Sequence, residues 1–253
     1  MSNFFRKIRK KSLAHVQLKK YFFYAGGEIL LVVSGILIAL SINNWNEERK
    51  VRNQERAYLI SLKEEFSYNL SSLESAIKLN EDHKDQSYRI LQSASPASSN
   101  LTEQEFDQIF LKTISTEMQY RPRGGVVSEI LNSGKLDIFD TRVRNKLASW
   151  EADLLRIRFQ EEEHSRYRLS LFGMTEEDGN LRNLIHLGDS SINLSSSEFE
   201  GLNVTLLQSR EFENLLVAFY VTAGYMTESY YLPFENSIQE ALFFIEERLK
   251  ALG

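Results

Sequence analysis

The chain contains no cysteine and only three prolines among its 253 residues. The missing cysteine excludes disulfides, thiolate metal sites and cysteine nucleophiles. The scarcity of proline, together with only 12 glycines, favours long helices over a turn-rich β fold. Hydrophobic residues make up 42% of the chain and charged residues 26%, so most of it is expected to fold.

Recognisable catalytic motifs are also missing. The sequence has no phosphate-binding glycine pattern, and none of its many serines lies in a nucleophile elbow. The one metal-like pattern is Glu161-x-x-His164, but di-iron bundles need two such pairs and no second pair is present. We therefore interpret residues 161–163, with Arg166 and Arg168, as a solvated helix face. We predict no enzyme activity, no metal site and no cofactor.

Charge is distributed unevenly along the chain. Residues 1–20 hold seven of the 30 basic residues and none of the 35 acidic ones. The seven are Arg6, Lys7, Arg9, Lys10, Lys11, Lys19 and Lys20. A basic tail ahead of an apolar run predicts a cytoplasmic N-terminus, with the tail at the inner surface of the lipid bilayer. Nucleic-acid binding is not expected, since no recognisable nucleic-acid-binding fold accompanies these bases.

The apolar run spans residues 21–42 and contains a single charged residue, Glu28. As a helix it would be about 33 Å long, enough to cross a hydrocarbon core of about 30 Å. Tyr21 and Tyr24 at one end, and Trp45 at the other, are placed as interfacial aromatic residues are. We predict a cytoplasmic tail (1–20), a transmembrane helix (21–43) and an extracytoplasmic domain (44–253).

A cleaved signal peptide is the alternative to a membrane span. Its apolar segment would run from Ile29 to Leu40, with a cleavage site at Ala39-Leu40-Ser41. The basic region ahead of the run is long for a signal peptide, and the run itself has the length of a span. Both interpretations place the rest of the chain outside the cytosol.

Small residues line one face of the predicted span. Gly27, Gly35 and Ala39 recur at multiples of four, a spacing that lets two helix backbones approach closely. Glu28 lies two helical turns before Gly35, near the same face. Glu28 either packs in a helix–helix contact, which would favour a homo-oligomer or a partner membrane protein, or reaches back to the inner interface beside Lys19 or Lys20.

Apolar residues at spacings of three and four predict an all-α body, most simply an antiparallel helical bundle. The first helix should continue from the membrane to about residue 92. Thr102 and Glu105 form a capping box for the next helix, a short helix should stop at Gly134, and Asp140 should cap a long helix ending near residue 173.

The rest of the body is expected to be loop and then helix again. Residues 174–204 are expected to form a loop, with a short strand at 191–195. Helix returns from 215 to 249, separated or kinked at Pro233. The loop "YRPRGG" (120–125) offers Arg121 and Arg123, which could contact an anionic ligand or be solvated and paired locally.

Two segments resemble a known family. "YAGGEILLVVSGILIALSINNWNEERK" after "FFRKIRKK", and "SEILNSGKLDIFDTRVRNKL" at 128–147, are similar to a domain-of-unknown-function family of single-pass membrane proteins from flavobacteria and their relatives. The resemblance implies an inner-membrane anchor with a helical periplasmic domain. It implies no activity, cofactor or catalytic residue.

We therefore predict an oligomeric, membrane-anchored scaffold or interaction module. A ligand-sensing domain acting through a separate membrane partner is the alternative, since a tail of 20 residues leaves no room for a signalling domain. An envelope enzyme is the least favoured possibility.

Overall fold

The computed structural model describes residues 3–94 and 100–252, with side chains from Phe22 onward except that of Tyr24. The seven basic tail residues, Tyr21 and Tyr24 therefore lie outside the described side chains. The chain divides into two compact units, Met1–Glu55 and Arg56–Gly253. The described residues form helices and no strand, so the predicted all-α class is confirmed.

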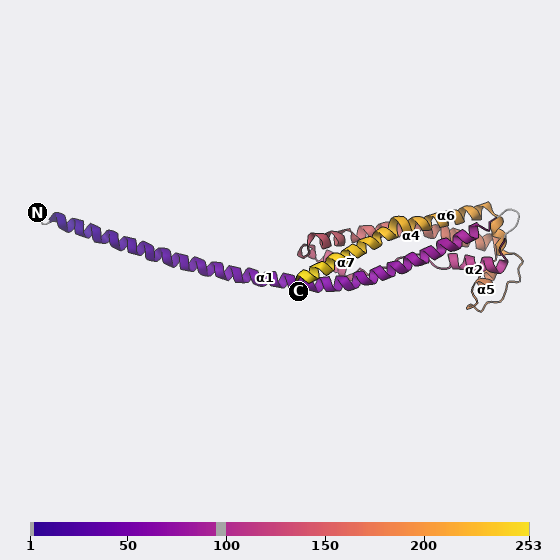
Figure 1. The fold of residues 1–253 in the computed structure, drawn as a ribbon, viewed down its shortest axis with the longest axis horizontal. Coiled ribbons are helices and arrows are strands. Elements are labelled where there is room, and N and C mark those ends of the chain that lie inside the picture. The colour runs from indigo at the N-terminus through magenta and orange to yellow at the C-terminus, as the bar shows by residue number, and fades with distance from the viewer. Residues whose placement is uncertain (1–2, 95–99, 253) are drawn as a thin grey trace. The chain divides into compact units, whose positions relative to one another are not determined.

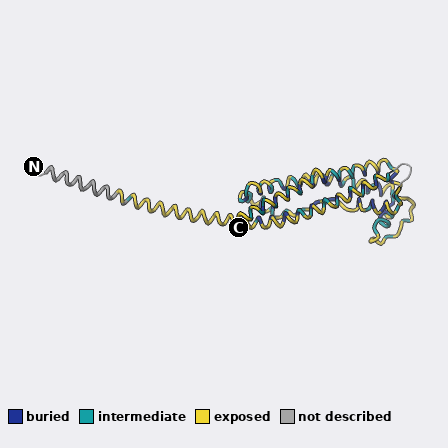
Figure 2. Tube along the Cα trace, in the orientation of Figure 1, coloured by how far each residue is buried: buried dark blue, intermediate teal, exposed yellow. Residues whose placement is uncertain are grey.

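Helix α1 runs from Asn3 to Leu91, so it ends where predicted and begins earlier, within the basic tail. Its first part belongs to the N-terminal unit. Every residue from 26 to 54 is exposed, and Figure 2 shows this stretch in yellow. The described part of α1 contains an 18-residue window with a mean hydropathy of 2.2 and no buried residue. It is the one described helix long and apolar enough to cross a membrane.

The second unit contains the last part of α1 and all the later elements (Figure 1). These are α2 (Glu103–Ile114), α3 (Gly125–Asn132), η1 (Lys135–Ile138), α4 (Thr141–Asp178), α5 (Leu181–Gly188), η2 (Asn203–Gln208), α6 (Arg210–Met226), η3 (Thr227–Tyr231) and α7 (Leu232–Leu252).

Helix ends follow the predicted capping residues. The Thr102 hydroxyl accepts from the Glu105 backbone N–H, and the Glu105 carboxylate accepts from the Thr102 N–H, which completes the capping box of α2. Asp140 accepts hydrogen bonds from two backbone N–H groups at the start of α4. Gly134 follows α3 with φ of 67°, a conformation that glycine adopts without steric cost.

Long-range contacts show that the long helices are antiparallel. Lys63 of α1 pairs with Glu246 of α7, whereas Asn80 further along α1 bonds the Ala223 carbonyl of α6. On α4, Arg142 likewise pairs with Glu247 of α7 and His164 contacts Thr222 of α6. The helices α1 and α4 thus run one way, and α6–α7 runs back beside both of them.

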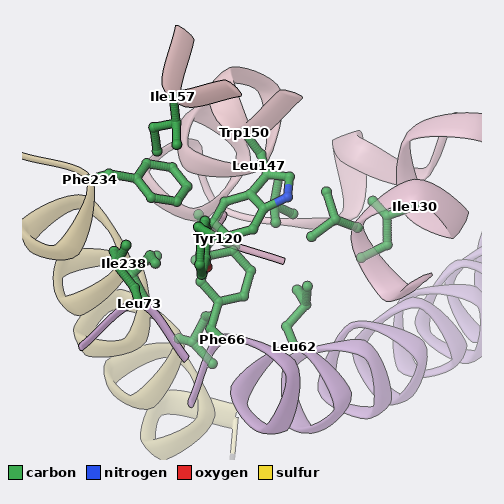
Figure 3. Close-up of a cluster of buried hydrophobic side chains, with 14 of the residues drawn as sticks. Leu62, Phe66, Leu73, Tyr120, Ile130, Leu147, Trp150, Ile157, Phe234 and Ile238 are labelled. Atoms are coloured by element: carbon green, nitrogen blue, oxygen red, sulfur yellow. The ribbon is translucent and has the colours of Figure 1, made fainter. Parts of the chain in front are cut away.

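Two apolar clusters fill the bundle. One includes Phe66, Trp150 and Phe234, with ring centroids 4.8 Å and 5.0 Å apart in successive pairs (Figure 3). The other surrounds Phe106, Phe110, Phe212 and the α5 residue Leu184. Phe66, Trp150, Phe106 and Phe110 come from the predicted helical stripes, whereas Phe212 and Leu184 lie outside them. Burial of these side chains is the main stabilising contribution to the bundle.

The region after residue 173 differs from the prediction. Helix α4 continues to Asp178, and α5 lies where a loop was expected. Asn180 caps α5 by accepting from the Asn183 backbone N–H, and Leu184 is fully buried, which together stabilise this single short amphipathic helix. The strand expected at 191–195 is wrong.

Pro233 does not end the helix that contains it. Instead α6 passes into α7 through one π-helical turn, Thr227–Tyr231, where the Leu232 N–H donates to the Thr227 carbonyl five residues back. Proline has no N–H and its ring crowds the preceding turn, and the wider π turn accommodates both effects.

Candidate functional site

The second leg of the bundle, formed by α2 and α3 together (residues 103–132), is broken in the middle. Between α2 and α3, residues 115–124 are not helical, so their backbone groups need partners from elsewhere. Polar side chains of the neighbouring helices supply them. The Asn69 amide bonds both the N–H and the carbonyl of Arg123 at 2.8 Å, and Arg168 donates to the Ile114 carbonyl at 3.0 Å.

Glu65 of α1 caps the helix that follows this break. Its two carboxylate oxygens accept from the N–H groups of Val126 and Val127, at 2.9 and 3.2 Å. These N–H groups lie in the first turn of α3, where no intrahelical acceptor exists. Gly124, directly before α3, provides no side-chain cap. The long-range contact from Glu65 therefore replaces a local capping residue.

Glu161 of α4 is the most constrained of these groups. Its Oε1 atom accepts from the Tyr120 backbone N–H and from the Tyr231 hydroxyl, both at 2.6 Å. Burial raises the pKa of this carboxyl, and the two hydrogen bonds and Arg158 oppose the shift. Its Oε2 atom is buried and has no hydrogen-bond partner in the described part of the chain.

Two buried histidines lie near the ring of Phe219. His164 lies 4.2 Å from the Phe219 ring and has Nδ1 3.0 Å from the Thr222 hydroxyl, while His83 lies 6.3 Å from the same ring. Burial lowers the pKa of His83 to about 4 and that of His164 to about 3. Both imidazoles are therefore neutral near pH 7.

Glu161, His164, His83 and Asn80 form a buried polar layer, and the π turn between α6 and α7 contacts it. Asn80 of α1 donates to the Ala223 carbonyl at 2.7 Å and to the Thr227 hydroxyl at 2.8 Å. Tyr231, at the other end of the turn, bonds Glu161. The distorted turn and the buried polar residues thus form one connected region between the two apolar clusters.

A second buried polar cluster lies beside α2 and α5. The Asn203 amide donates to Asp107 Oδ1 at 2.9 Å and to the Asn180 carbonyl, and it accepts from the Asn180 N–H. Burial raises the pKa of Asp107 to about 7, helped by the nearby Glu103 charge. This cluster joins the 3-10 turn η2 to α2.

The interpretation of residues 161–163, Arg166 and Arg168 as a solvated face is wrong for Glu161, which is 4% exposed, and for Arg168, which is half-buried and donates to the Ile114 carbonyl. The neighbouring His164 is 1% exposed. The signal that identifies them is present in the sequence. The stripe of α4 reaches Ile157, and steps of four and three continue it to Glu161, His164 and Arg168.

These buried groups do not assemble a metal site of the kind the Glu-x-x-His pattern suggests. No group of three or more His, Cys, Asp or Glu side chains among the described residues is placed to hold a metal ion. Glu161 and His164 face different partners one helical turn apart. What the layer can do chemically is bind hydrogen-bond donors and respond to protonation.

The predicted packing residues of the span have exposed side chains in the structure. Gly27, Glu28, Gly35 and Ala39 are all exposed, and an added Cβ at Gly35 would meet nothing within 4 Å. Trp45 is 58% exposed and lies below the Arg49 guanidinium. The roles predicted for these residues in a membrane stay predictions.

The loop arginines have local partners. The Arg123 guanidinium lies 3.6 Å from the Tyr68 ring centroid, a stacking contact, and Arg121 donates to the Gln119 side chain at 2.8 Å. The two guanidinium groups therefore contact different neighbours.

A family of unknown function, DUF6090, matches residues 28–175, more than half of the chain. The chain belongs to this family. The matched range includes most of the apolar stretch and the segment 128–147, both of which carried the resemblance found in the sequence. No curated protein and no solved structure matches the chain.

Proposed function

We propose that this protein is a single-pass inner-membrane protein whose helical domain, residues 44–253, lies in the periplasm and acts as an interaction module. The exposed apolar part of α1 and the basic tail ahead of it support an anchor with a cytoplasmic N-terminus. The role is one of binding rather than catalysis, because the buried acids mainly bond backbone groups and other side chains of the fold.

One observation on the bundle carries the proposal. Val217, Val221 and Tyr225 form a row along the outer face of α6, and they are 42%, 50% and 61% exposed. No charged residue occurs between Glu213 and Glu228. A charge-free apolar row on an outer helix is typical of protein–protein contact surfaces, whose buried centres are depleted of charge.

The partner we propose is a helical membrane protein, with a second copy of this chain as the simplest case. The small-residue face of the span, Gly27, Gly35 and Ala39, would bring a second transmembrane helix close to the first. The apolar row of α6 would contact the partner outside the membrane.

Site-specific photo-crosslinking in native membranes tests this. A photoreactive residue at Val221 should give a discrete cross-linked product, and one at the exposed Glu177 of α4 should not. Mass spectrometry of the product distinguishes a second copy from another protein. Equal, diffuse labelling at both positions would contradict the proposal.

The absence of cysteine makes topology directly testable. A cysteine introduced at the exposed Ser190 should react with a membrane-impermeant maleimide in spheroplasts, whereas one at Ser12 should react only after permeabilisation. The reverse pattern would overturn the proposed orientation. Loss of the Ser12 label from the mature protein would instead identify a cleaved signal peptide.

A further inference from the structure

A cavity lies beside the broken leg of the bundle. It has a volume of about 530 Å³ and lies between α4 and residues 117–119. Its lining includes Glu117, Met118, Arg158, Phe159, Glu161 and Leu169. This volume is within the range of small-molecule sites, roughly 300–1,000 Å³.

The cavity has a simple structural origin. An α-helix with its side chains is about 10–12 Å wide, and the non-helical segment 115–124 is thinner. Where this segment replaces a helix, the bundle leaves space along α4. Phe159 and Leu169 are 65% and 55% exposed on this side, although both are large apolar residues.

One residue that lines this cavity, Glu161, has a buried oxygen atom without a hydrogen-bond partner among the described residues. Glu161 is 4% exposed, and its Oε1 atom already accepts the two donors available within the fold, from Tyr120 and Tyr231. The Oε2 atom accepts no hydrogen bond from the residues that the structure describes. A buried carboxylate oxygen without a donor is costly, and a ligand that donates a hydrogen bond would remove this cost.

The other charges of the cavity restrict the ligand further. Arg166 pairs with Glu163 on the same helix. Arg158 and Glu117 form no ion pair in the described part of the chain, and both act on the Glu161 carboxyl at a distance. Among the described residues, the lining groups without an ion pair are thus three carboxylates, those of Glu117, Glu161 and Glu162, and the Arg158 guanidinium. They lie beside the apolar side chains of Phe159, Leu169 and Met118.

We propose that this cavity binds an α-amino acid with an apolar side chain, or the amino-terminal end of a short peptide. The ammonium group donates to Glu161 Oε2 and lies near Glu117, the carboxylate binds Arg158, and the side chain packs on Phe159 and Leu169. This inference does not depend on the α6 contact surface or on the nature of a protein partner.

Binding of the ammonium group is coupled to the loss of a proton from the Glu161 carboxyl. Glu161 faces Arg158 on its own helix, Glu117 and Tyr120 on the non-helical segment, and Tyr231 on the π turn. Its pKa is raised in the free protein, so the ammonium group must displace a proton from part of the population. Affinity should therefore increase as pH rises through that pKa.

Equilibrium dialysis of the full-length protein in detergent micelles, with radiolabelled leucine, tests the proposal. Leucine should bind saturably at concentrations up to about 10 mM, and Glu161→Gln should weaken it by about tenfold or more. Glu177→Gln, an exposed change on the same helix, should leave binding unchanged and controls for partition into micelles.

Unlabelled competitors identify the chemistry. 4-Methylpentanoate has the side chain and carboxylate of leucine without its ammonium group, and it should not compete. Leucyl-leucine competing better than leucine would identify a peptide end, and the reverse would identify the free amino acid. Competition by 4-methylpentanoate equal to that of leucine overturns the proposal, as does the absence of saturable binding to both leucine and leucyl-leucine.

Two further variants keep the test decisive if Glu161→Gln folds poorly. Phe159→Ser changes an exposed residue of the cavity and should weaken leucine binding without altering the helical circular dichroism spectrum. Arg158→Gln should weaken leucine more than leucinamide, which has no carboxylate. Unchanged leucine binding in both variants would remove the cavity as the site.

Discussion

The side chain of Asn69 forms two hydrogen bonds of 2.8 Å with the backbone of Arg123, one to its carbonyl and one from its N–H. A single amide on α1 thus takes the place of a backbone partner for the non-helical segment. The Tyr120 hydroxyl also donates to the Asn69 carbonyl, at 3.2 Å. Asn69 itself is fully buried, so the two bonds to Arg123 are shielded from solvent on the Asn69 side.

Replacing Asn69 should therefore loosen the broken leg. Asn69→Leu keeps the approximate side-chain volume but leaves the Arg123 N–H and carbonyl unpaired, and it should cost about 1–3 kcal/mol of unfolding free energy. Urea unfolding of the full-length protein in detergent, followed by circular dichroism, measures the change. Asn145→Leu, an exposed change on α4, should stay within about 0.5 kcal/mol. Equal effects of the two changes would contradict this role.

The buried Asp107 should make the protein less stable as pH rises. Its pKa is about 7 in the folded protein against 3.8 in the unfolded chain, so the folded state binds more protons between these values. Stability therefore falls by up to about 1.4 kcal/mol per pH unit as pH increases through this window. Asp107→Asn retains the acceptor for Asn203 and should remove this dependence. A urea midpoint that varies with pH as in the wild type would refute it.

The two core histidines should act in the opposite direction. Their pKa values are about 4 and 3 in the folded protein against 6.5 in the unfolded chain, so the unfolded state binds protons first on acidification. Stability falls as pH drops below about 6.5. His83→Leu should flatten this loss while leaving stability at pH 7.5 equal or higher, because two buried ring nitrogens without partners are removed. Asp107→Asn is the matched comparison, since it changes the slope with the opposite sign.

Two glycines provide a paired test of the packing of α5 on α2. A Cβ at Gly188 would lie 2.8 Å from Leu111 Cδ2 and 2.9 Å from the Asp107 carbonyl oxygen, so Gly188→Ala should cost about 1–3 kcal/mol. A Cβ at Gly173, inside α4, would meet nothing within 4 Å. Gly173→Ala should stabilise the protein by about 0.5–1 kcal/mol, because alanine loses less conformational entropy in a helix. Thermal unfolding that shifts in the same direction for both would reject the α5–α2 contact.

Periodicity predicted most of the fold because the long helices bury regular stripes. The stripes beginning at Leu59 and Val143 place the apolar clusters correctly, and local capping signals at Thr102 and Asp140 mark two helix starts. Helix α5 was missed because it has only eight residues within a polar, serine-rich region. Its stability depends on the burial of Leu184 by residues distant in sequence.

The candidate site was misjudged because residue type was given more weight than position. Glu161, His164 and His83 lie on the continuing stripes, but charged or polar residues are seldom buried without partners. Their partners are a backbone N–H at Tyr120, a hydroxyl at Thr222 and an aromatic ring at Phe219. None of these contacts has a local sequence signal, because each joins different legs of the bundle.

Glu28 is the single acidic residue of the predicted span. If Glu28 bonds a second helix across the small-residue face, Glu28→Leu should weaken self-association by about threefold to thirtyfold, whereas Glu28→Gln should retain most of it. The reason is that interhelical hydrogen bonds in membranes contribute about 0.6–2 kcal/mol. Gly35→Leu should also weaken association, since its side chain would separate the two backbones.

Förster transfer between labelled copies in liposomes measures the association. Val33→Leu adds volume on another face of the same helix and should leave it unchanged, which separates loss of packing from a general effect of a larger residue. If both Glu28 variants associate like the wild type, the carboxylate is not in the contact. Its remaining role would then be to reach the inner interface, where neutralising it changes nothing that this measurement detects.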